Sequence, residues 1–356
     1  MQRVGMDKIV YKLGKIFSSL GYNEYKMNKF EEYDLYARNK DFLISGNVIT
    51  FNDTNGKLLA LKPDVTLSII KNTKIVEGVK KVFYCENVYR VSSKSNGFKE
   101  IPQMGLECVG NLDLYNVAEV ISVAKESLEA ISKDNILEIS PVGIVFDFVN
   151  SLNLKSEDKK EIYKLIDGKN VHELKNLLMD CSINQSDIET LTELVTLYGP
   201  SKIIIEKLKA LFKGKSQQNL VKNFEQVILA FGKTDLERVM IDCSACKNVK
   251  YYNDVTFRGY VDGIPKAVLS GGRYDDLLKS MGSDNGAIGF AVYLDELDRL
   301  FKEEKDYDVD VLLIYDQNSK VENVLEKVKE IRADGKSVTA LKSKSTNVAY
   351  KEIIEI

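Results

Sequence analysis

Strand patterns in this sequence come in adjacent pairs, whereas helical patterns come in separate runs, and this segregation constrains the fold most strongly. The segment "LISGNVITFNDTNGKLLALK" alternates apolar and polar residues on both sides of Asn55-Gly56, a dipeptide typical of hairpin turns. "KVFYCENVYRV" and "IPQMGLECVG" are two further strand patterns, joined by a polar loop. Strands joined by hairpins, with helices elsewhere, predict an α+β fold with an antiparallel sheet rather than a doubly wound parallel one.

The middle of the chain has a different pattern. From about residue 143 to 235, helical periods follow one another without a convincing strand. We therefore predict an all-helical insertion at 143–235 between two parts of one core, 1–142 and 236–303. Residues 304–356 have a strand–helix–strand pattern and are predicted to form a short α/β segment, which is small for an independent domain.

Composition argues against several classes of protein. The formal net charge is -3 and the isoelectric point is near 5.6, so the chain lacks the overall basic excess of a typical nucleic-acid binder. No apolar run approaches the roughly 20 residues of a membrane span. The first residues contain no uninterrupted apolar segment of the kind found in signal peptides. These features favour a cytoplasmic protein.

The cysteines and the single histidine give little support to a metal site. Cys243 and Cys246 have the spacing of half a zinc site, but a tetrahedral site needs two more ligands. The sequence contains no second close pair of cysteine or histidine residues, and His172 lies in a polar helical stretch. We interpret the two cysteines as small residues in or beside a strand, and we expect neither a metal nor a cofactor.

Polar side chains interrupt the strand patterns at two places in the first half of the chain. Asp64 and Thr66 follow a proline in "LKPDVT". The neighbouring pair of strands carries a second cluster, Glu86, Arg90, Gln103 and Glu107. If these strands form a hairpin, alternation places Gln103, Gly105 and Glu107 on one face.

Buried carboxylates and amides on a sheet face are costly unless a ligand or a counter-charge satisfies them. Acidic groups suit an ammonium and Arg90 suits a carboxylate, so a zwitterion such as an amino acid fits this cluster. The alternative is a solvated strand face with ordinary ion pairs.

A third cluster spans "KYYNDVTF" and "LSGGRYDDLL". Gly271 and Gly272 precede a helix that we expect to begin near Arg273, where their amides would be able to hold an anion. A tight turn from strand to helix is the alternative. Tyr251 and Tyr252 are adjacent on a predicted strand, so we expect at most one of them to face a pocket.

In this order, the motifs "LKPDVT", "VYR…PQMGLE", "YYNDVTF", "SGGRYDDL" and "AIGFAVYLDEL" resemble the catalytic core of histidyl-tRNA synthetase, a class II aminoacyl-tRNA synthetase. The resemblance covers most of residues 1–303. It implies a six-stranded antiparallel sheet flanked by helices, and a homodimer. It also implies a histidine pocket formed by Asp64, Thr66, Arg90, Gln103, Glu107 and Tyr252.

Two positions depart from the synthetase pattern where that family handles ATP and the activated carboxylate. Lys247 stands in "KNVKYY" where the synthetases have an arginine, and a lysine does not reproduce a planar, bidentate guanidinium. Glu296 stands in "YLDEL" where an arginine would stack on the ATP ring, and a carboxylate there adds repulsion. The loop "RVSSKSNGFKE" keeps only Lys94 and Lys99 in place of the arginines that clamp ATP.

The dimer motif and the tail depart as well. Asn28 lies near the place of the motif's proline, before Glu31, and the tail is about half the length implied by a complete anticodon-binding domain.

These losses fall on ATP and tRNA, while the amino-acid pocket is kept. That pattern is similar to the regulatory subunits of ATP phosphoribosyltransferase, the first enzyme of histidine biosynthesis. The similarity implies a non-catalytic subunit that joins a short-form catalytic subunit, which condenses ATP with phosphoribosyl pyrophosphate. It implies that the subunit is required for catalytic activity and for feedback inhibition by L-histidine, as a homodimer within a hetero-oligomer that binds no tRNA.

Two alternatives stay open from the sequence. One is a divergent histidyl-tRNA synthetase, and the other is a free-standing histidine-binding paralogue with another partner. The sequence also leaves open whether inhibitory histidine occupies the synthetase-like pocket or a subunit interface.

Overall fold

The computed structural model describes residues 2–40, 43, 48–73, 78–91, 97–232, 236–245, 251–301, 307–344 and 347–356. The chain divides into two units, Met1–Phe301 and Lys302–Ile356.

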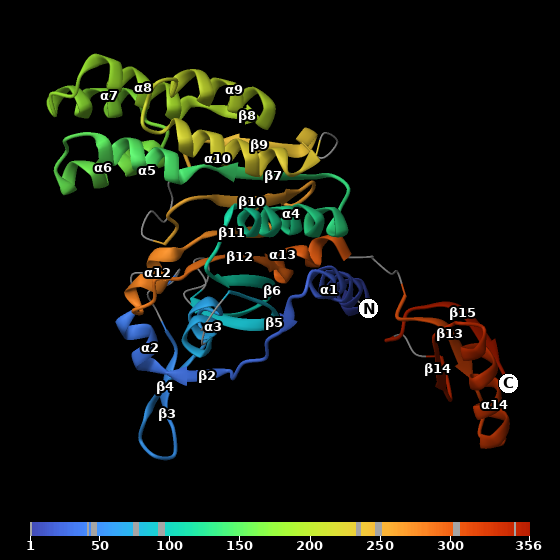
Figure 1. The fold of residues 1–356 in the computed structure, drawn as a ribbon. Helices are drawn as coiled ribbons and strands as arrows, with labels where there is room; N and C mark the ends of the chain where they lie inside the picture. The colour runs from blue at the N-terminus through green and yellow to red at the C-terminus, as the bar shows by residue number, and fades with distance from the viewer. Residues whose placement is uncertain are drawn as a thin grey trace. The chain divides into compact units, whose positions relative to one another are not determined.

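A nine-stranded sheet forms the centre of the first unit (Figure 1). Its strands, in spatial order, are β1 (Asn23–Glu24), β5 (Val79–Val91), β6 (Phe98–Gly110), β12 (Gly286–Tyr293), β11 (Leu269–Arg273), β10 (Thr256–Val261), β7 (Asn135–Ser140), β9 (Val239–Asp242) and β8 (Tyr198–Pro200). The six strands from β5 to β7 pair with one another in antiparallel fashion throughout. The α+β fold with an antiparallel sheet is thus confirmed, and β1, β9 and β8 extend the sheet at its two edges.

Two long helices, α1 (Gln2–Ser19) and α4 (Leu114–Ile131), cover one face of this sheet. Met104, Leu106 and Cys108 of β6 point into the core beneath them and are almost fully buried. Alternation along β6 therefore sends Gln103, Gly105 and Glu107 to the opposite face. The register of the β5–β6 hairpin places Val82 opposite Glu107 and Tyr84 opposite Gly105.

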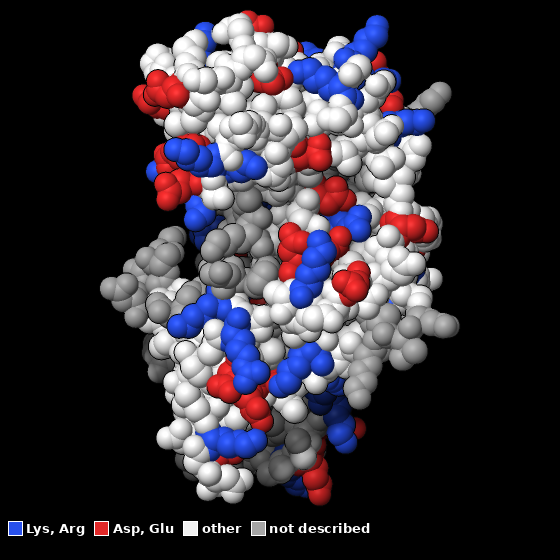
Figure 2. All heavy atoms as spheres, turned by 60° about the vertical axis from the view of Figure 1, so that its left-hand side comes forward, with Lys and Arg blue, Asp and Glu red and all other residues white. Residues whose placement is uncertain are grey.

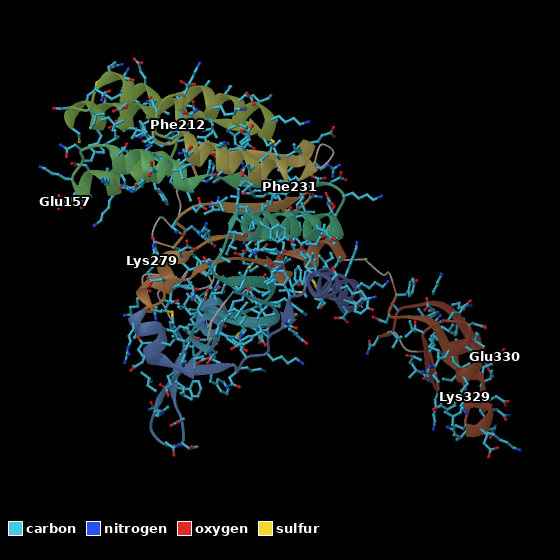
Figure 3. All side chains as sticks on the ribbon, viewed as in Figure 1. Glu157, Phe212, Phe231, Lys279, Lys329 and Glu330 are labelled. Atoms are coloured by element: carbon cyan, nitrogen blue, oxygen red, sulfur yellow. The ribbon has the colours of Figure 1, made fainter. Side chains whose placement is uncertain are left out.

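Most of residues 143–235, the predicted insertion, form a layer of helices beyond β7 and β9 (Figure 1). These helices are α5 (Val142–Ser151), α6 (Ser156–Asp167), α7 (Val171–Asp180), α8 (Gln185–Thr196), α9 (Ser201–Leu211) and α10 (Gln218–Leu229). Phe212 lies inside the layer and is fully buried, with its ring centroid 5.7 Å from that of Phe148 (Figure 3). One short strand, β8, interrupts the expected run of helices because its backbone pairs with the edge of β9.

A small second sheet has the order β2 (Phe30–Glu32), β4 (Leu58–Leu61) and β3 (Thr50–Asn52). The turn between β3 and β4 contains Gly56 with φ of +79°, a left-handed conformation that favours glycine. The hairpin predicted from Asn55-Gly56 is confirmed. Two short helices follow strands of this sheet in sequence: α2 (Tyr33–Arg38) comes after β2, and α3 (Thr66–Asn72) comes after β4.

Short helices complete the first unit. They are α12 (Asp275–Ser280), α13 (Leu294–Leu297) and 3-10 turns at Leu236–Arg238 and Asp298–Phe301. The face drawn in Figure 2 carries interspersed acidic and basic side chains rather than one large field of a single sign. Within the described part of the chain, none of the helices has the length and apolar character needed to span a membrane.

The second unit is a parallel sheet of order β14 (Val338–Leu341), β13 (Val309–Ile314) and β15 (Tyr350–Glu355), with one helix, α14 (Val321–Ala333). Val311, Leu312 and Leu313 of the central strand are fully buried. Lys329 and Glu330, labelled in Figure 3, lie on the exposed side of α14.

Candidate functional site

The polar face of the large sheet carries a narrow cavity, called here the Glu107 pocket. All six residues of the predicted histidine pocket line it, and these are Asp64, Thr66, Arg90, Gln103, Glu107 and Tyr252. The structure therefore brings together side chains from β5, β6, the first residue of α3 with the segment before it, and the segment before β10. The free space inside is about 40 Å³, enough for a few ordered waters.

Glu107 lies at the centre of this pocket and is 2% exposed. The hydroxyl of Thr66 donates to Oε1 at 2.8 Å, and the hydroxyl of Tyr274 donates to Oε2. Burial raises the pKa of Glu107 to about 8, although both hydroxyl donors act to lower it. The carboxyl group therefore changes charge near neutral pH.

The backbone of β12 makes room for this carboxyl group. A Cβ atom on Gly289 would lie 1.8 Å from Oε2 of Glu107 and 2.4 Å from the carbonyl oxygen of Leu106. Only glycine fits at this position while Glu107 keeps its place.

Asp64 and Arg90 form a second polar centre in the pocket. Nη2 of Arg90 lies 3.7 Å from Oδ2 of Asp64, and Nε of Arg90 donates to the carbonyl of Pro63 at 2.8 Å. The amide of Leu67 donates to Oδ1 of Asp64 at 3.1 Å. Burial raises the pKa of Asp64, and Arg90 opposes that shift. The pocket thus offers both an anionic and a cationic group.

Gln103 has an unsatisfied donor. Its side chain is 3% exposed, and its Nε2 atom has no hydrogen-bond partner among the described residues. A buried amide donor without a partner is costly. It would be satisfied by an acceptor atom from outside the chain, either a water or a ligand.

Tyrosines fill much of the pocket wall, and the sequence interpretation missed four of them. These are Tyr84, Tyr251, Tyr274 and Tyr293. The expectation that only one of Tyr251 and Tyr252 faces a pocket was wrong, because both precede β10 in a turn where strand alternation does not apply. Their ring centroids are 4.7 Å apart.

The glycine pair has a different role from the anion site that we considered. Gly271 and Gly272 lie within β11 and pair with β12, and helix α12 begins only at Asp275. A Cβ atom on Gly272 would lie 2.5 Å from the ring of Tyr252. Because Gly272 has no side chain, the ring of Tyr252 is able to pack directly against the sheet at this position.

Glu86 has a structural partner instead of a place in the pocket. Its Oε2 atom accepts from the fully buried ammonium of Lys62 at 2.9 Å. Part of the polar cluster on this hairpin is thus the ordinary ion pair that we considered as the alternative.

Two lysines, Lys99 on β6 and Lys266 in the loop after β10, form ion pairs with acidic residues of α13. Lys266 pairs with Glu296 at 2.8 Å, and Lys99 pairs with Asp295. Three positions of the sequence interpretation, Lys94, Cys246 and Lys247, lie outside the described residues. Cys243 is buried, and the described residues contain no cluster of potential metal ligands.

The single histidine of the sequence does not line the Glu107 pocket. His172 is exposed on α7, and its Nε2 is 3.3 Å from Nδ2 of Asn176 on the same helix.

Comparison with known proteins places this geometry in a family. A family model described as histidyl-tRNA synthetase matches residues 3–297. An ATP phosphoribosyltransferase regulatory subunit of Clostridium botulinum (strain Langeland) is 31% identical over 317 residues, which cover 85% of this chain and 75% of the relative. The chain belongs to the ATP phosphoribosyltransferase regulatory subunit family.

One further relative and two solved structures are also similar to this chain. A regulatory subunit of Caldanaerobacter subterraneus is 33% identical over 296 residues, covering 80% of this chain and 76% of that protein. A solved structure titled as an ATP phosphoribosyltransferase regulatory subunit/histidyl-tRNA synthetase from Bacillus halodurans has a TM-score of 0.81 at 20% identity, covering 99% of this chain and 94% of the other. The ATP phosphoribosyl transferase (HisG:HisZ) complex from Thermotoga maritima has a TM-score of 0.64 at 20% identity, covering 81% of this chain and 97% of that one. These structures share the fold of the regulatory subunit.

Proposed function

We propose that this regulatory subunit binds L-histidine in the Glu107 pocket and thereby regulates a short-form ATP phosphoribosyltransferase catalytic subunit that it also activates. The unsatisfied amide of Gln103 carries the proposal, because it is a buried donor in a cavity that also contains Asp64, Arg90 and Glu107. The name of the Thermotoga maritima complex supports assembly with a catalytic partner.

An amino acid matches the charges of the pocket. Its carboxylate would accept from Gln103 and Arg90, and its ammonium would pair with Asp64. Glu107 would then meet the imidazole, which carries an N–H donor in every protonation state. The narrow cavity requires that some tyrosine side chains move when histidine enters.

Regulation requires that histidine bind one state of the complex more tightly than the other. The tyrosine walls supply a structural difference between an empty and an occupied pocket. Movement of these side chains on histidine binding would affect the catalytic subunit wherever their segments contact it.

The same proposal includes the absence of amino-acid activation. Asp295 and Glu296 pair with Lys99 and Lys266 and so reduce the positive charge that these lysines would offer to a triphosphate. The two carboxylates would also repel it.

The experiment is a binding and activity assay on the complex. Histidine should bind the mixture of this chain with a short-form catalytic subunit, and the catalytic subunit should be active only in that mixture. Loss of inhibition in Glu107→Ala, with activation retained, supports the pocket as the effector site. Unchanged inhibition in that variant places the effector elsewhere.

We also propose that the subunit forms a homodimer through the small sheet. One face of that sheet presents Phe30 and Phe51, which are 49% and 37% exposed and whose ring centroids are 5.2 Å apart. Pairing places Leu61 beside Phe30 and Leu59 beside Phe51 on the same face. The other face packs Ala60 into the core with Tyr36. An exposed apolar face of this kind is typical of an interface.

A further inference from the structure

A second cavity lies on the helical side of the same strands. It is called here the helix-side cavity, and α4, α5, α10, the turn at 253–255 and the start of α12 enclose it. Its volume is about 470 Å³, which falls in the range of roughly 300–1,000 Å³ that is usual for small-molecule sites. The function proposed above makes no use of it.

The wall of this cavity is apolar on its helical side. Val117 of α4, Ile144 of α5, and Phe224 and Val227 of α10 all line it. Each of these side chains is less than a tenth exposed, so the wall is part of the packed core. An apolar body would gain free energy by covering it.

The charged residues of the lining are mainly acidic. Asp147, Asp254 and Asp275 line the cavity together with one cation, Arg273. Three carboxylates against one guanidinium leave an excess of negative charge. Lys159 bonds Asn150 at 3.1 Å but does not line the cavity.

The single arginine is already engaged. Nε of Arg273 donates to both carboxylate oxygens of Asp275, at 2.9 and 3.1 Å, and Nη1 reaches Asp254 at 3.3 Å. The side chain of Asp254 is 46% exposed. Asp254 is therefore a carboxylate that a second cation is able to reach, as is Asp147, which is exposed on α5.

Two segments separate this cavity from the Glu107 pocket and line both. In the first, Tyr252 lines the Glu107 pocket, while Asn253 and Asp254 line the helix-side cavity. In the second, Tyr274 faces the pocket between Arg273 and Asp275, which line the cavity.

Hydrogen bonds lock these segments together. The amide of Asn253 donates to the carbonyl of Arg273 at 3.1 Å, and the amide of Asp275 donates to Oδ1 of Asn253 at 3.0 Å. Tyr274 in turn donates to Glu107. A cation that draws Asp254 away from Arg273 would therefore act on the wall of the Glu107 pocket.

We propose that the helix-side cavity binds a small organic cation with an apolar body, and that its occupancy is coupled to that of the Glu107 pocket through the shared wall. The coupling rests on the function proposed above, whereas binding in the cavity does not. Coupling of this kind is reciprocal, so each ligand changes the affinity of the other by the same factor.

The test uses three probes with one apolar body and different charges, phenylbutylamine, phenylbutanol and phenylbutyrate, titrated into the full chain by calorimetry. The amine should bind most tightly and the carboxylate least. Asp254→Asn should weaken the amine by about tenfold, the scale of a lost charge-assisted hydrogen bond. Asn223→Trp, at an exposed lining position on α10, should block all three probes, and Asp276→Asn is the matched control that should leave binding unchanged.

Equal affinity for the three probes, or full affinity in the Asn223→Trp variant, would overturn the site. The titration is then repeated with saturating histidine. If histidine binds but leaves the affinity for the amine unchanged, the coupling is wrong and the binding site in the cavity stands. If the protein binds the amine but fails to bind histidine, the binding site in the cavity is supported and the function proposed for the Glu107 pocket is wrong.

Discussion

Oε1 of Glu296 lies 2.8 Å from the ammonium of Lys266, so the residue that replaces an expected arginine is held in an ion pair with the protein's own lysine. Asp295, its neighbour in the chain, holds Lys99 in the same way. Two adjacent carboxylates of α13 thus pair with two lysines, whereas the synthetase-like pattern would require positive charge for a triphosphate. The arrangement gives a physical reason why the pocket that we propose for an amino acid would not also activate it.

The first prediction concerns that separation. The protein should show no histidine-dependent exchange of pyrophosphate into ATP, because the carboxylates beside these lysines reduce the local positive charge and repel the nucleotide. Restoring arginine at Lys247 and Glu296 together should not create exchange, since Lys99 stays paired with Asp295. A histidyl-tRNA synthetase assayed in parallel is the positive control, and robust exchange by the unmodified chain would refute the regulatory function.

A second prediction concerns the ligand of Glu107. Glu107→Ala should weaken histidine binding by about 1–3 kcal/mol, the cost of leaving a buried polar group unpaired. Calorimetry on the complex measures this change. Glu119→Ala is the matched control, because Glu119 is also a buried glutamate but bonds Tyr22 and Lys81. Equal losses in both variants would indicate general destabilisation instead of a lost contact.

The raised pKa of Glu107 predicts a pH dependence of stability. Burial moves the pKa from 4.5 to about 8, so the unfolded chain releases this proton at lower pH than the folded chain does. Between these values the unfolded state binds fewer protons, and stability falls as pH rises, by at most about 1.4 kcal/mol per pH unit.

Glu107→Gln has no proton to release at this position. The difference in free energy of unfolding between wild type and variant should therefore shift in favour of the variant as pH rises from about 5 to 8. Urea denaturation at a series of pH values checks this, and titrations shared by both proteins cancel in the difference. A difference that is independent of pH would contradict the assigned shift.

The close approach of β12 to Glu107 gives a fourth prediction. Gly289→Ala places a methyl group 1.8 Å from the carboxylate and 2.4 Å from a backbone oxygen, so it should abolish histidine binding and destabilise the fold by about 1–3 kcal/mol. Gly14→Ala is the control, because the nearest atom to its new methyl group is Cε of Met104 at 3.7 Å. Tyrosine fluorescence follows binding directly, since the chain contains no tryptophan.

How much of this could be predicted from sequence depends on how local each feature is. The β3–β4 hairpin was predictable because Asn55-Gly56 specifies its turn and alternation specifies its faces. The common face of Gln103 and Glu107 follows from the same alternation. The class of fold is confirmed as well, whereas the division of residues 1–303 into core and insertion remains a prediction.

Contacts between distant segments were not predictable from local patterns. Tyr274 and Glu107 are 167 residues apart in sequence, and no local pattern marks one as the partner of the other. Tyr251 and Tyr252 were assigned to a strand because their residue types favour one, but the chain turns there so that both rings face the pocket. Strand β8 is three residues long and forms only because β9 offers an unpaired edge.

The last prediction concerns assembly. Analytical ultracentrifugation should show a dimer of the isolated chain and a larger species after addition of a short-form catalytic subunit. A stable dimer needs an interface of at least about 1,200 Å² in total, and the exposed face around Phe30 and Phe51 supplies apolar area for it. Phe51→Glu should produce monomers because it buries a charge without a partner, whereas Tyr115→Glu, at a 64% exposed aromatic on α4, should leave the dimer intact. If Phe51→Glu remains dimeric, the interface lies on another surface. If the wild-type chain neither enlarges nor activates the catalytic subunit, it functions with a different partner.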